Sequence, residues 1–184
     1  MKNGGVKKCG TVACVLINGE SIAKRVGELA AEIEKDFRAG GAESFDMLWL
    51  AEGAFMFAAD LAKNFEMRMR VFSLKVSSYG SGHRPAGVPE YCGDFSPFCG
   101  REVLLVDDVL DTGATARHIV RELQKNGASK VKTCFLLEKQ NSAGNFNADF
   151  VGFKIPDKYV FGYGLDDGFY LRNLPDIMYL ENGS

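Results

Sequence analysis

Three aspartates stand close together near the middle of the chain, directly after a run of apolar residues. Asp107 and Asp108 follow the run Val103–Val106, and Asp111 comes three residues after Asp108. Two neighbouring carboxylates can accept hydrogen bonds from vicinal hydroxyls, such as those of a ribose. A third carboxylate at the rim of the following turn can act as a general base toward a reacting group. The spacing therefore indicates acid–base chemistry on a hydroxylated substrate.

The turn after these acids has the composition of an anion-binding turn. Thr112, Gly113, Ala114 and Thr115 lead into a predicted helix over residues 114–125, whose first N–H groups and positive dipole end suit a phosphate. Gly113 allows close approach of the backbone, and the two threonines add hydroxyl donors. The chain has neither the Gly-Lys-Ser/Thr of a Walker loop nor a GxGxxG sequence. Any one of these residues alone is more often a cap or a solvent-facing side chain, but their combination favours a site.

Helices and strands alternate along the chain, which predicts an α/β fold with a largely parallel sheet. Ligands bind at the carboxyl ends of the strands in such folds, where Asp107 and Asp108 would lie. Asn18 is a plausible N-cap for the first helix. The predicted helices are Ile22–Phe37, Ala54–Phe65 and Ala114–Lys125, and the predicted strands are Phe45–Leu50, Arg70–Val76, Val103–Val106, Lys130–Lys139 and two short ones near Phe150–Val151 and Tyr159–Val160.

The segment Ser77–Gly100 breaks this alternation. It is rich in Gly, Ser and Pro and is long for a connection within a domain, which is typical of a functional lid or a disordered segment. The sequence has no internal repeat and no linker composition. We therefore expect residues 1–184 to form a single domain.

Bulk composition narrows the function classes. Hydrophobic residues make up 46% and charged residues 25% of the 184 residues, and the net charge is -2. This balance argues against nucleic-acid or membrane-surface binding by bulk charge. No apolar run reaches membrane-spanning length and no signal peptide is evident, so we expect a cytoplasmic protein. The five cysteines form no close metal-ligand pattern with His83 or His118, which favours reduced thiols over a zinc site.

The stretch VLLVDDVLDTGATARHIV resembles the phosphoribosyl-pyrophosphate-binding motif of type I phosphoribosyltransferases. Aspartate at position 111 is similar to the hypoxanthine-guanine branch, since adenine enzymes typically carry alanine there. The segments SIAKRVGELAAEI, EGAFMFAADL, SSYG, LLEK and FVGFKIPDKYVFGYGLDDGFYLRNLP occur in the same order as in that branch. The resemblance implies the type I phosphoribosyltransferase fold, with a small hood formed by the terminal segments and a flexible active-site loop.

The resemblance also assigns roles around phosphoribosyl pyrophosphate. Asp107 and Asp108 would bind the ribose hydroxyls, and residues Asp111–Thr115 would cradle the 5′-phosphate. The lid would include Ser78 and Tyr79. The pyrophosphate-binding positions would be Glu52, Gly53 and Arg172.

On the purine side, the resemblance makes Asp111 the catalytic residue, acting on N7 of the base. Lys139 would hydrogen-bond the 6-oxo group, Tyr159 would stack on the ring, and the backbone of Val160 would read the purine edge. Asp166 would approach the base and help to hold Mg²⁺. The full set of implied magnesium ligands is Asp166, Asp107 and Asp108.

Two segments depart from the family pattern. The family usually has a lysine before the glycine that opens the second helix, but this chain has Glu52 before Gly53. A glutamate there would repel pyrophosphate unless it points away or reaches magnesium. The lid sequence GVPEYCGDFSPF is also unusual, because Pro89 and Pro97 restrict a strand.

The resemblance implies a transferase that joins hypoxanthine or guanine to phosphoribosyl pyrophosphate, giving IMP or GMP and pyrophosphate. A homodimer or homotetramer is expected, with no nucleic-acid partner. The alternatives are a weakly active or regulatory paralogue, which Glu52 would favour, and a transferase for another nucleobase. Singly, Lys139 and Tyr159 could be a solvated lysine and a packing aromatic, and Arg172 could simply pair with Asp166 or Asp167.

Overall fold

A mixed sheet forms the body of the protein. The computed structural model describes residues 7–8, 11–77, 90–92, 94–140 and 146–182. The six strands of this sheet stand in the order β5-β4-β3-β6-β7-β8, and every neighbouring pair is parallel except β4 and β5. This arrangement confirms the α/β prediction. The strands are β3 (Ser44–Ala51), β4 (Arg68–Ser77), β5 (Glu90–Cys92), β6 (Glu102–Leu110), β7 (Lys130–Lys139) and β8 (Phe150–Ile155).

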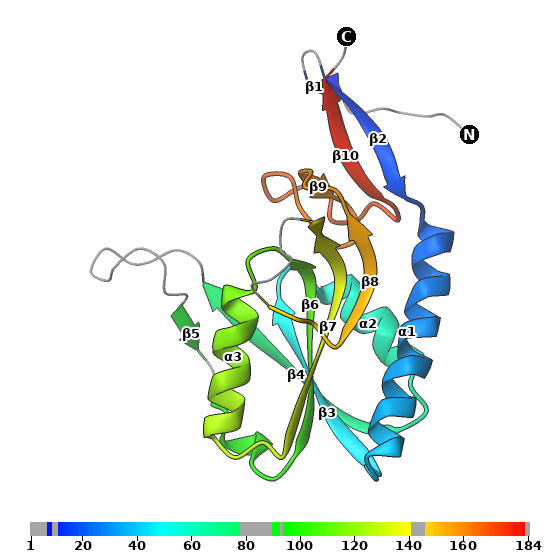
Figure 1. Cartoon of the computed structure of the whole chain (residues 1–184). Coiled ribbons are helices and arrows are strands. Elements are labelled where there is room, and N and C mark those ends of the chain that lie inside the picture. The colour runs from blue at the N-terminus through cyan, green and yellow to red at the C-terminus, as the bar shows by residue number, and fades with distance from the viewer. Residues whose placement is uncertain (1–6, 9–10, 78–89, 93, 141–145, 183–184) are drawn as a thin grey trace.

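Helices cover both faces of this sheet. Helices α1 (Gly19–Ala39) and α2 (Phe55–Lys63) lie on one face, and α3 (Ala114–Lys125) lies on the other (Figure 1). Successive strand residues point to opposite faces, so β6 supplies both cores: Leu104 packs toward α1 and α2, and Leu105 packs toward α3. The predicted cap of α1 is confirmed, because the Asn18 side chain accepts a hydrogen bond from the Ser21 N–H at 2.8 Å.

A second, antiparallel sheet forms the hood. Its strand order is β1-β2-β10-β9, from β1 (Lys7–Lys8), β2 (Thr11–Ile17), β9 (Val160–Phe161) and β10 (Ile177–Asn182). The two ends of the chain therefore meet in one sheet, as the resemblance implied, although the sequence pattern assigned no strand to residues 11–17 or 177–182. Figure 1 shows the hood beyond the carboxyl ends of the main strands, where it faces the edge that carries the acids.

Some boundaries differ from the predictions. Strand β6 does not end at Val106 but continues to Leu110, so Asp107 and Asp108 belong to the strand itself. Within the segment predicted as irregular, residues 90–92 pair with β4 and residues 96–98 form the 3₁₀ helix η1. Pro97 lies at the start of η1, where a missing N–H costs nothing. No helix among the residues that the structure describes is long and apolar enough to cross a membrane.

Candidate active site

Asp107 and Asp108 lie side by side near the carboxyl end of β6. Asp107 Oδ1 accepts a hydrogen bond from the Asp108 N–H at 2.9 Å, and Asp108 Oδ1 accepts one from the Val109 N–H at 2.8 Å. Removal from water and the neighbouring Asp108 carboxylate raise the pKa of Asp107 well above its usual range. Burial also raises the pKa of Asp108, although its hydrogen bonds and the Arg172 charge oppose the rise. The protein thus compensates the negative charge of the ionised pair only in part.

The turn after the acids opens α3 with an anion-binding geometry. Gly113 is the N-cap residue with φ 69°, a left-handed conformation that favours glycine. The Phe146 side chain packs directly against Gly113, which leaves no space for a β-carbon. The Ala114 N–H donates to Thr112 Oγ1 at 3.4 Å, and Thr115 follows in the first helical turn. The N–H groups and the positive dipole end of this helix start suit a phosphate, and the binding of one there stays a prediction.

Asp111 and Lys139 meet across the ends of two neighbouring strands. Strands β6 and β7 pair in parallel with Leu110 opposite Glu138, which places the following residues side by side. Lys139 Nζ lies 3.9 Å from Asp111 Oδ2 and 3.1 Å from Asp157 Oδ1. The Asp111 side chain is 67% exposed, whereas that of Lys139 is 19% exposed. Sequence reasoning missed Asp157, whose only signal was an acid two residues after the end of β8.

Two of the residues predicted to bind the purine, Tyr159 and Asp166, are joined by a hydrogen bond. Tyr159 is exposed, and its hydroxyl donates to the backbone carbonyl of Asp166 at 3.1 Å. Val160 is buried in β9. Asp166 Oδ2 accepts a hydrogen bond from the Phe169 N–H at 2.9 Å, and Asp166 Oδ1 lies 2.9 Å from Arg172 Nη2. The Asp166 carboxylate is therefore held by its own loop.

Arg172 joins the hood to the turn after β3. Its Nη1 donates to the Gly164 carbonyl at 2.6 Å, and its Nη2 faces Asp166. The same Nη2 lies 3.8 Å from Glu52 Oε2. Glu52 therefore turns toward a cation of its own chain, an arrangement that the sequence did not predict. The pairing of Arg172 with Asp166, raised as the simpler reading of that arginine, is found.

Glycines bring this turn close to the acids. The peptide bond between Ala51 and Glu52 is cis. Gly53 packs against the Asp108 carboxylate, and Gly164 packs against the Gly53 carbonyl, so neither position has space for a β-carbon. The turn after β3 therefore contacts both the end of β6 and the hood. The two lid residues Ser78 and Tyr79 lie outside the described residues.

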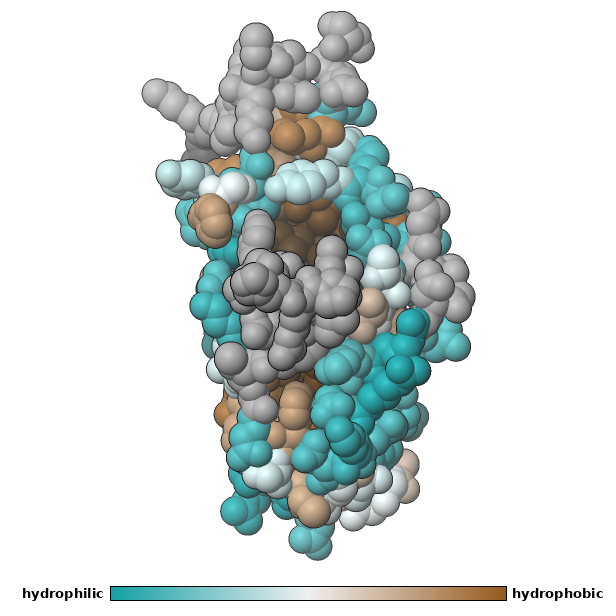
Figure 2. Space-filling model, turned by 90° about the vertical axis from the view of Figure 1, so that its left-hand side faces the viewer, coloured by the Kyte–Doolittle hydropathy of each residue, from teal (hydrophilic) through white to brown (hydrophobic). Residues whose placement is uncertain are grey.

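The surface between hood and body is recessed. Figure 2 shows hydrophobic surface at the floor of a recess below the hood, bordered by hydrophilic residues. An apolar floor with polar edges suits an aromatic ring that carries polar substituents. The recess is thus compatible with a purine, and the stacking role of Tyr159 stays a prediction.

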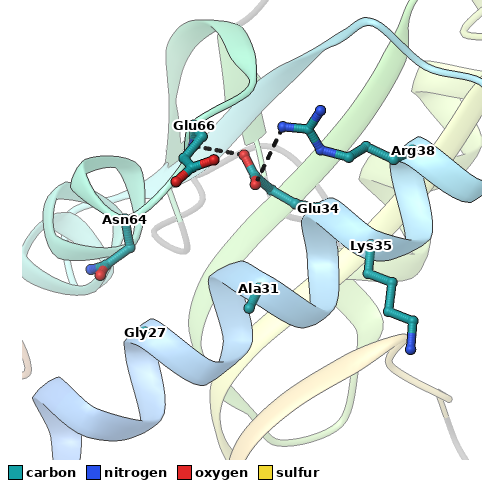
Figure 3. Close-up of a pocket in the computed structure, with 7 residues that line it drawn as sticks. All are labelled: Gly27, Ala31, Glu34, Lys35, Arg38, Asn64 and Glu66. Carbon is teal, nitrogen blue, oxygen red and sulfur yellow. Dashed lines mark hydrogen bonds and ion pairs between the residues drawn. The ribbon is translucent and has the colours of Figure 1, made fainter.

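A separate surface hollow lies at the other end of the molecule. It has a volume of about 480 Å³ between α1 and the turn before β4 (Figure 3). Glu34 Oε1 accepts a hydrogen bond from the Glu66 N–H at 2.7 Å, and Arg38 pairs with Glu34 at 3.7 Å. These polar groups satisfy one another, so the hollow carries no sign of chemistry. Its lining residues are Gly27, Ala31, Glu34, Lys35, Arg38, Asn64 and Glu66.

The aspartates of this site suit Mg²⁺ only if a substrate supplies some of the ligands of the ion. Within the described ranges, no group of three or more His, Cys, Asp or Glu side chains could hold a metal ion. Magnesium usually keeps several waters and binds one or two carboxylates together with substrate phosphates. The partly compensated pair Asp107 and Asp108 fits that partial role, whereas Asp166 is already engaged by Arg172.

Comparison with known proteins shows extensive similarity. Residues 16–167 match the phosphoribosyl transferase domain family. Hypoxanthine-guanine phosphoribosyltransferase from Aquifex aeolicus (strain VF5) is 44% identical over 170 residues, covering 91% of this chain and 94% of that protein. A hypoxanthine-guanine phosphoribosyltransferase structure from Bacillus anthracis has a TM-score of 0.81 at 32% identity, covering 90% of this chain and 97% of the other. Hypoxanthine phosphoribosyltransferase from Trypanosoma cruzi, in complex with the product IMP, has a TM-score of 0.82 at 31% identity, with 91% and 93% covered.

Proposed function

We propose that this chain, which belongs to the phosphoribosyltransferase family, joins hypoxanthine or guanine to phosphoribosyl pyrophosphate in purine salvage. The products are the nucleoside 5′-monophosphate, IMP or GMP, and pyrophosphate. The observation that carries the proposal is the meeting of Asp111 and Lys139 at 3.9 Å. Neighbouring atoms N7 and O6 of a 6-oxopurine need an acceptor and a donor side by side, and this pair provides both.

The phosphoribosyl half of the substrate fits the end of β6. The turn of residues 112–115 supplies amides and hydroxyls for the 5′-phosphate, and Asp107 and Asp108 accept hydrogen bonds from the ribose hydroxyls. Gly53 and Arg172 supply a backbone turn and a cation for the pyrophosphate. Positive charge develops on the ribose carbon as its bond to pyrophosphate breaks, and these carboxylates stabilise it.

The purine half fits between β7 and the hood. Lys139 donates to O6, Tyr159 packs against the ring, and the Val160 backbone reads the ring edge. N9 of the purine bonds to the ribose carbon while the bond from that carbon to the pyrophosphate oxygen breaks. Asp111 receives the proton that the base must release through N7.

We assign Mg²⁺ as the cofactor, held by Asp107 and Asp108 together with the substrate and approached by Asp166. Bound there, the ion neutralises the charge of the leaving pyrophosphate. The support is the chemistry of the carboxylate pair, whose charge the protein only partly compensates. Binding of Mg²⁺ to the protein with and without pyrophosphate, measured by calorimetry, tests the assignment.

Assembly and location are part of the same proposal. We expect a homodimer or homotetramer acting in the cytoplasm. The cysteines Cys14, Cys99 and Cys134 are free thiols, which supports a reducing compartment. Sedimentation of the purified protein gives the oligomeric state.

Pyrophosphate release with a panel of nucleobases tests the reaction. Hypoxanthine and guanine should be turned over far faster than adenine, because an amino group leaves the Lys139 donor without an acceptor. Lys139→Met should lower hypoxanthine turnover by about tenfold or more, the equivalent of one lost hydrogen bond to a charged group. Lys154→Met, a control at an exposed strand lysine, should have little effect.

The alternatives give different outcomes in this assay. Equal turnover of adenine and hypoxanthine would remove the role of Lys139. Binding of phosphoribosyl pyrophosphate without turnover of any base would favour the regulatory paralogue, a reading that the altered residue Glu52 makes worth testing.

A further inference from the structure

Three acceptors surround the guanidinium of Arg172, and one of them, the Glu52 carboxylate, lies farther away than the other two. Gly164 O and Asp166 Oδ1 lie at hydrogen-bond distances of 2.6 and 2.9 Å from it. Glu52 Oε2 lies at 3.8 Å, beyond a good hydrogen bond, and its side chain is 62% exposed. Exposed ion pairs of this kind contribute little to stability, so the contact to Glu52 is easily broken. The two short contacts hold the arginine, and the long one is free to exchange.

Glu52 is attached to the same turn that receives the leaving group. Gly53, the next residue, packs on Asp108, and Gly164 packs on the Gly53 carbonyl. An anion bound by Arg172 and this backbone turn therefore lies close to the Glu52 carboxylate. Two like charges near one cation compete for it, and the carboxylate returns when the anion leaves.

We propose that Glu52 is a positioning residue that competes with pyrophosphate for Arg172 and so weakens the hold of the site on this product. The inference rests on the proposed function, in which Arg172 contacts the pyrophosphate group. It explains how a glutamate can stand at this position in a transferase. Binding of the substrate displaces the carboxylate at small cost, and the carboxylate then favours release, a step that limits many enzymes.

Glu52→Gln tests the competition directly. The dissociation constant of magnesium pyrophosphate, measured by calorimetry on the intact protein, should fall roughly two- to fivefold, the range expected from one exposed charge pair. The KM for phosphoribosyl pyrophosphate should fall by a similar factor, and kcat should not rise. Glu52→Asp keeps the charge and should stay close to the parent in pyrophosphate affinity.

A matched control separates a local effect from net charge. Glu66→Gln removes the same charge from an exposed glutamate in the turn two residues before β4. This variant should bind pyrophosphate like the parent. The gain in Glu52→Gln should also shrink in about 1 M salt, where the screening length is roughly 3 Å. Melting temperatures of all variants confirm that the fold is retained.

Four outcomes decide between this inference and its alternatives. Unchanged affinity in Glu52→Gln, or a change equal to that in Glu66→Gln, overturns the competition. Weaker affinity also overturns it, because Glu52 would then support binding. A parent protein that turns over hypoxanthine while Glu52→Gln binds no tighter leaves the proposed function intact and removes only this inference. A parent that neither binds pyrophosphate nor turns over a base overturns both.

Discussion

Aspartates lie at both ends of the main sheet, buried at one end and half-buried at the other, and the protein treats them in opposite ways. At the amino end of β3, Asp46 is fully buried, and Arg70 and Arg101 donate to it at 2.8 and 3.2 Å. Burial alone would raise the pKa of Asp46, but the hydrogen bonds of the two arginines hold it below its usual range. At the carboxyl end, removal from water raises the pKa of both Asp107 and Asp108, and the charge of Asp108 raises that of Asp107 further.

The difference separates a structural site from a functional one. The Asp46 cluster completes its own charge balance and fixes three strands together, because its members lie on β3 and β4 and just before β6. The charge of Asp107 and Asp108 is offset only in part, by Arg172, which supports the proposal that they bind a ligand that brings hydroxyls or a cation. Unfavourable charge of this kind is a cost to folding that active sites commonly carry.

The largest effect is expected from a substitution at the carboxyl end of the sheet. It should lower the catalytic rate and leave the stability nearly unchanged. Asp111→Asn keeps size and capping ability but removes the basic group, so kcat should fall about 10²- to 10⁴-fold. Affinity for phosphoribosyl pyrophosphate should change far less, because the turn of residues 112–115 and the pair on β6 remain. Steady-state kinetics with hypoxanthine measures both.

Its control is Glu122→Gln, which removes an acid near the far end of α3 and should leave kcat unchanged. If Asp111→Asn turns over within a few-fold of the parent, Asp111 only shapes the turn. Of the acids at the carboxyl end of the sheet, only Asp107 and Asp108 would then keep a proposed functional role.

The second-largest effect is expected at the amino end of the sheet, where a substitution of Asp46 should lower the stability of the protein. Asp46→Asn leaves two arginines facing a neutral group, and removal of one partner from a buried ion pair costs about 3 kcal/mol or more. The partial exposure of Arg70 and Arg101, 48% and 36%, keeps the cost near the lower end of that range. The melting temperature should fall by roughly 6–12 °C for a chain of this size, with kcat at 25 °C nearly unchanged. Differential scanning calorimetry measures the melting temperature.

Asp94→Asn is a suitable control, because its local partner is Ser96 in an exposed turn, and it should shift stability by less than about 0.5 kcal/mol. An unaltered melting temperature in Asp46→Asn would mean that the cluster stabilises nothing. The contrast between the two ends would then disappear.

The sequence indicated the candidate site at the carboxyl end more clearly than the Asp46 cluster at the amino end. Asp107, Asp108 and the turn at Gly113 share one continuous segment, so their spacing alone indicated a site. Asp46, Arg70 and Arg101 lie on separate segments, and only strand pairing in three dimensions brings them together. The same limit hid the contact of Glu52 with Arg172 and that of Lys139 with Asp157. The hood followed from the resemblance, since its two-residue strands β1 and β9 are too short for a periodic pattern.

A smaller, opposite change is expected when charge is removed from the carboxyl end. Asp108→Asn keeps the shape that packs on Gly53 and abolishes the repulsion with Asp107. The free energy of unfolding should rise by roughly 0.5–2 kcal/mol, as is common when a functional site loses an unfavourable feature. Affinity for phosphoribosyl pyrophosphate should fall in the same variant. A melting temperature below that of the parent would show that the pair is not a cost to folding.

The smallest effect is expected in the pH dependence of stability, to which the acids at the two ends of the sheet should contribute with opposite signs. The pKa of Asp46 is lowered in the folded state, so its stabilisation is present above the unfolded value of about 3.9 and is lost as pH falls through the folded value. The pKa values of Asp107 and Asp108 are raised, so the folded protein holds protons longer, and stability falls as pH rises above about 3.9. Urea unfolding of the metal-free protein from acid to neutral pH gives the curves.

Subtraction of the variant curves isolates each contribution, because all other titrating groups are shared. The advantage of the parent over Asp46→Asn should shrink toward the acid end of the range. The disadvantage of the parent relative to Asp108→Asn should instead grow from about pH 4 toward neutrality, where the pair must lose its protons. Parallel difference curves would mean that both ends respond to protons alike. In that case the arginines at Asp46 would not be what distinguishes the structural acid from the functional pair.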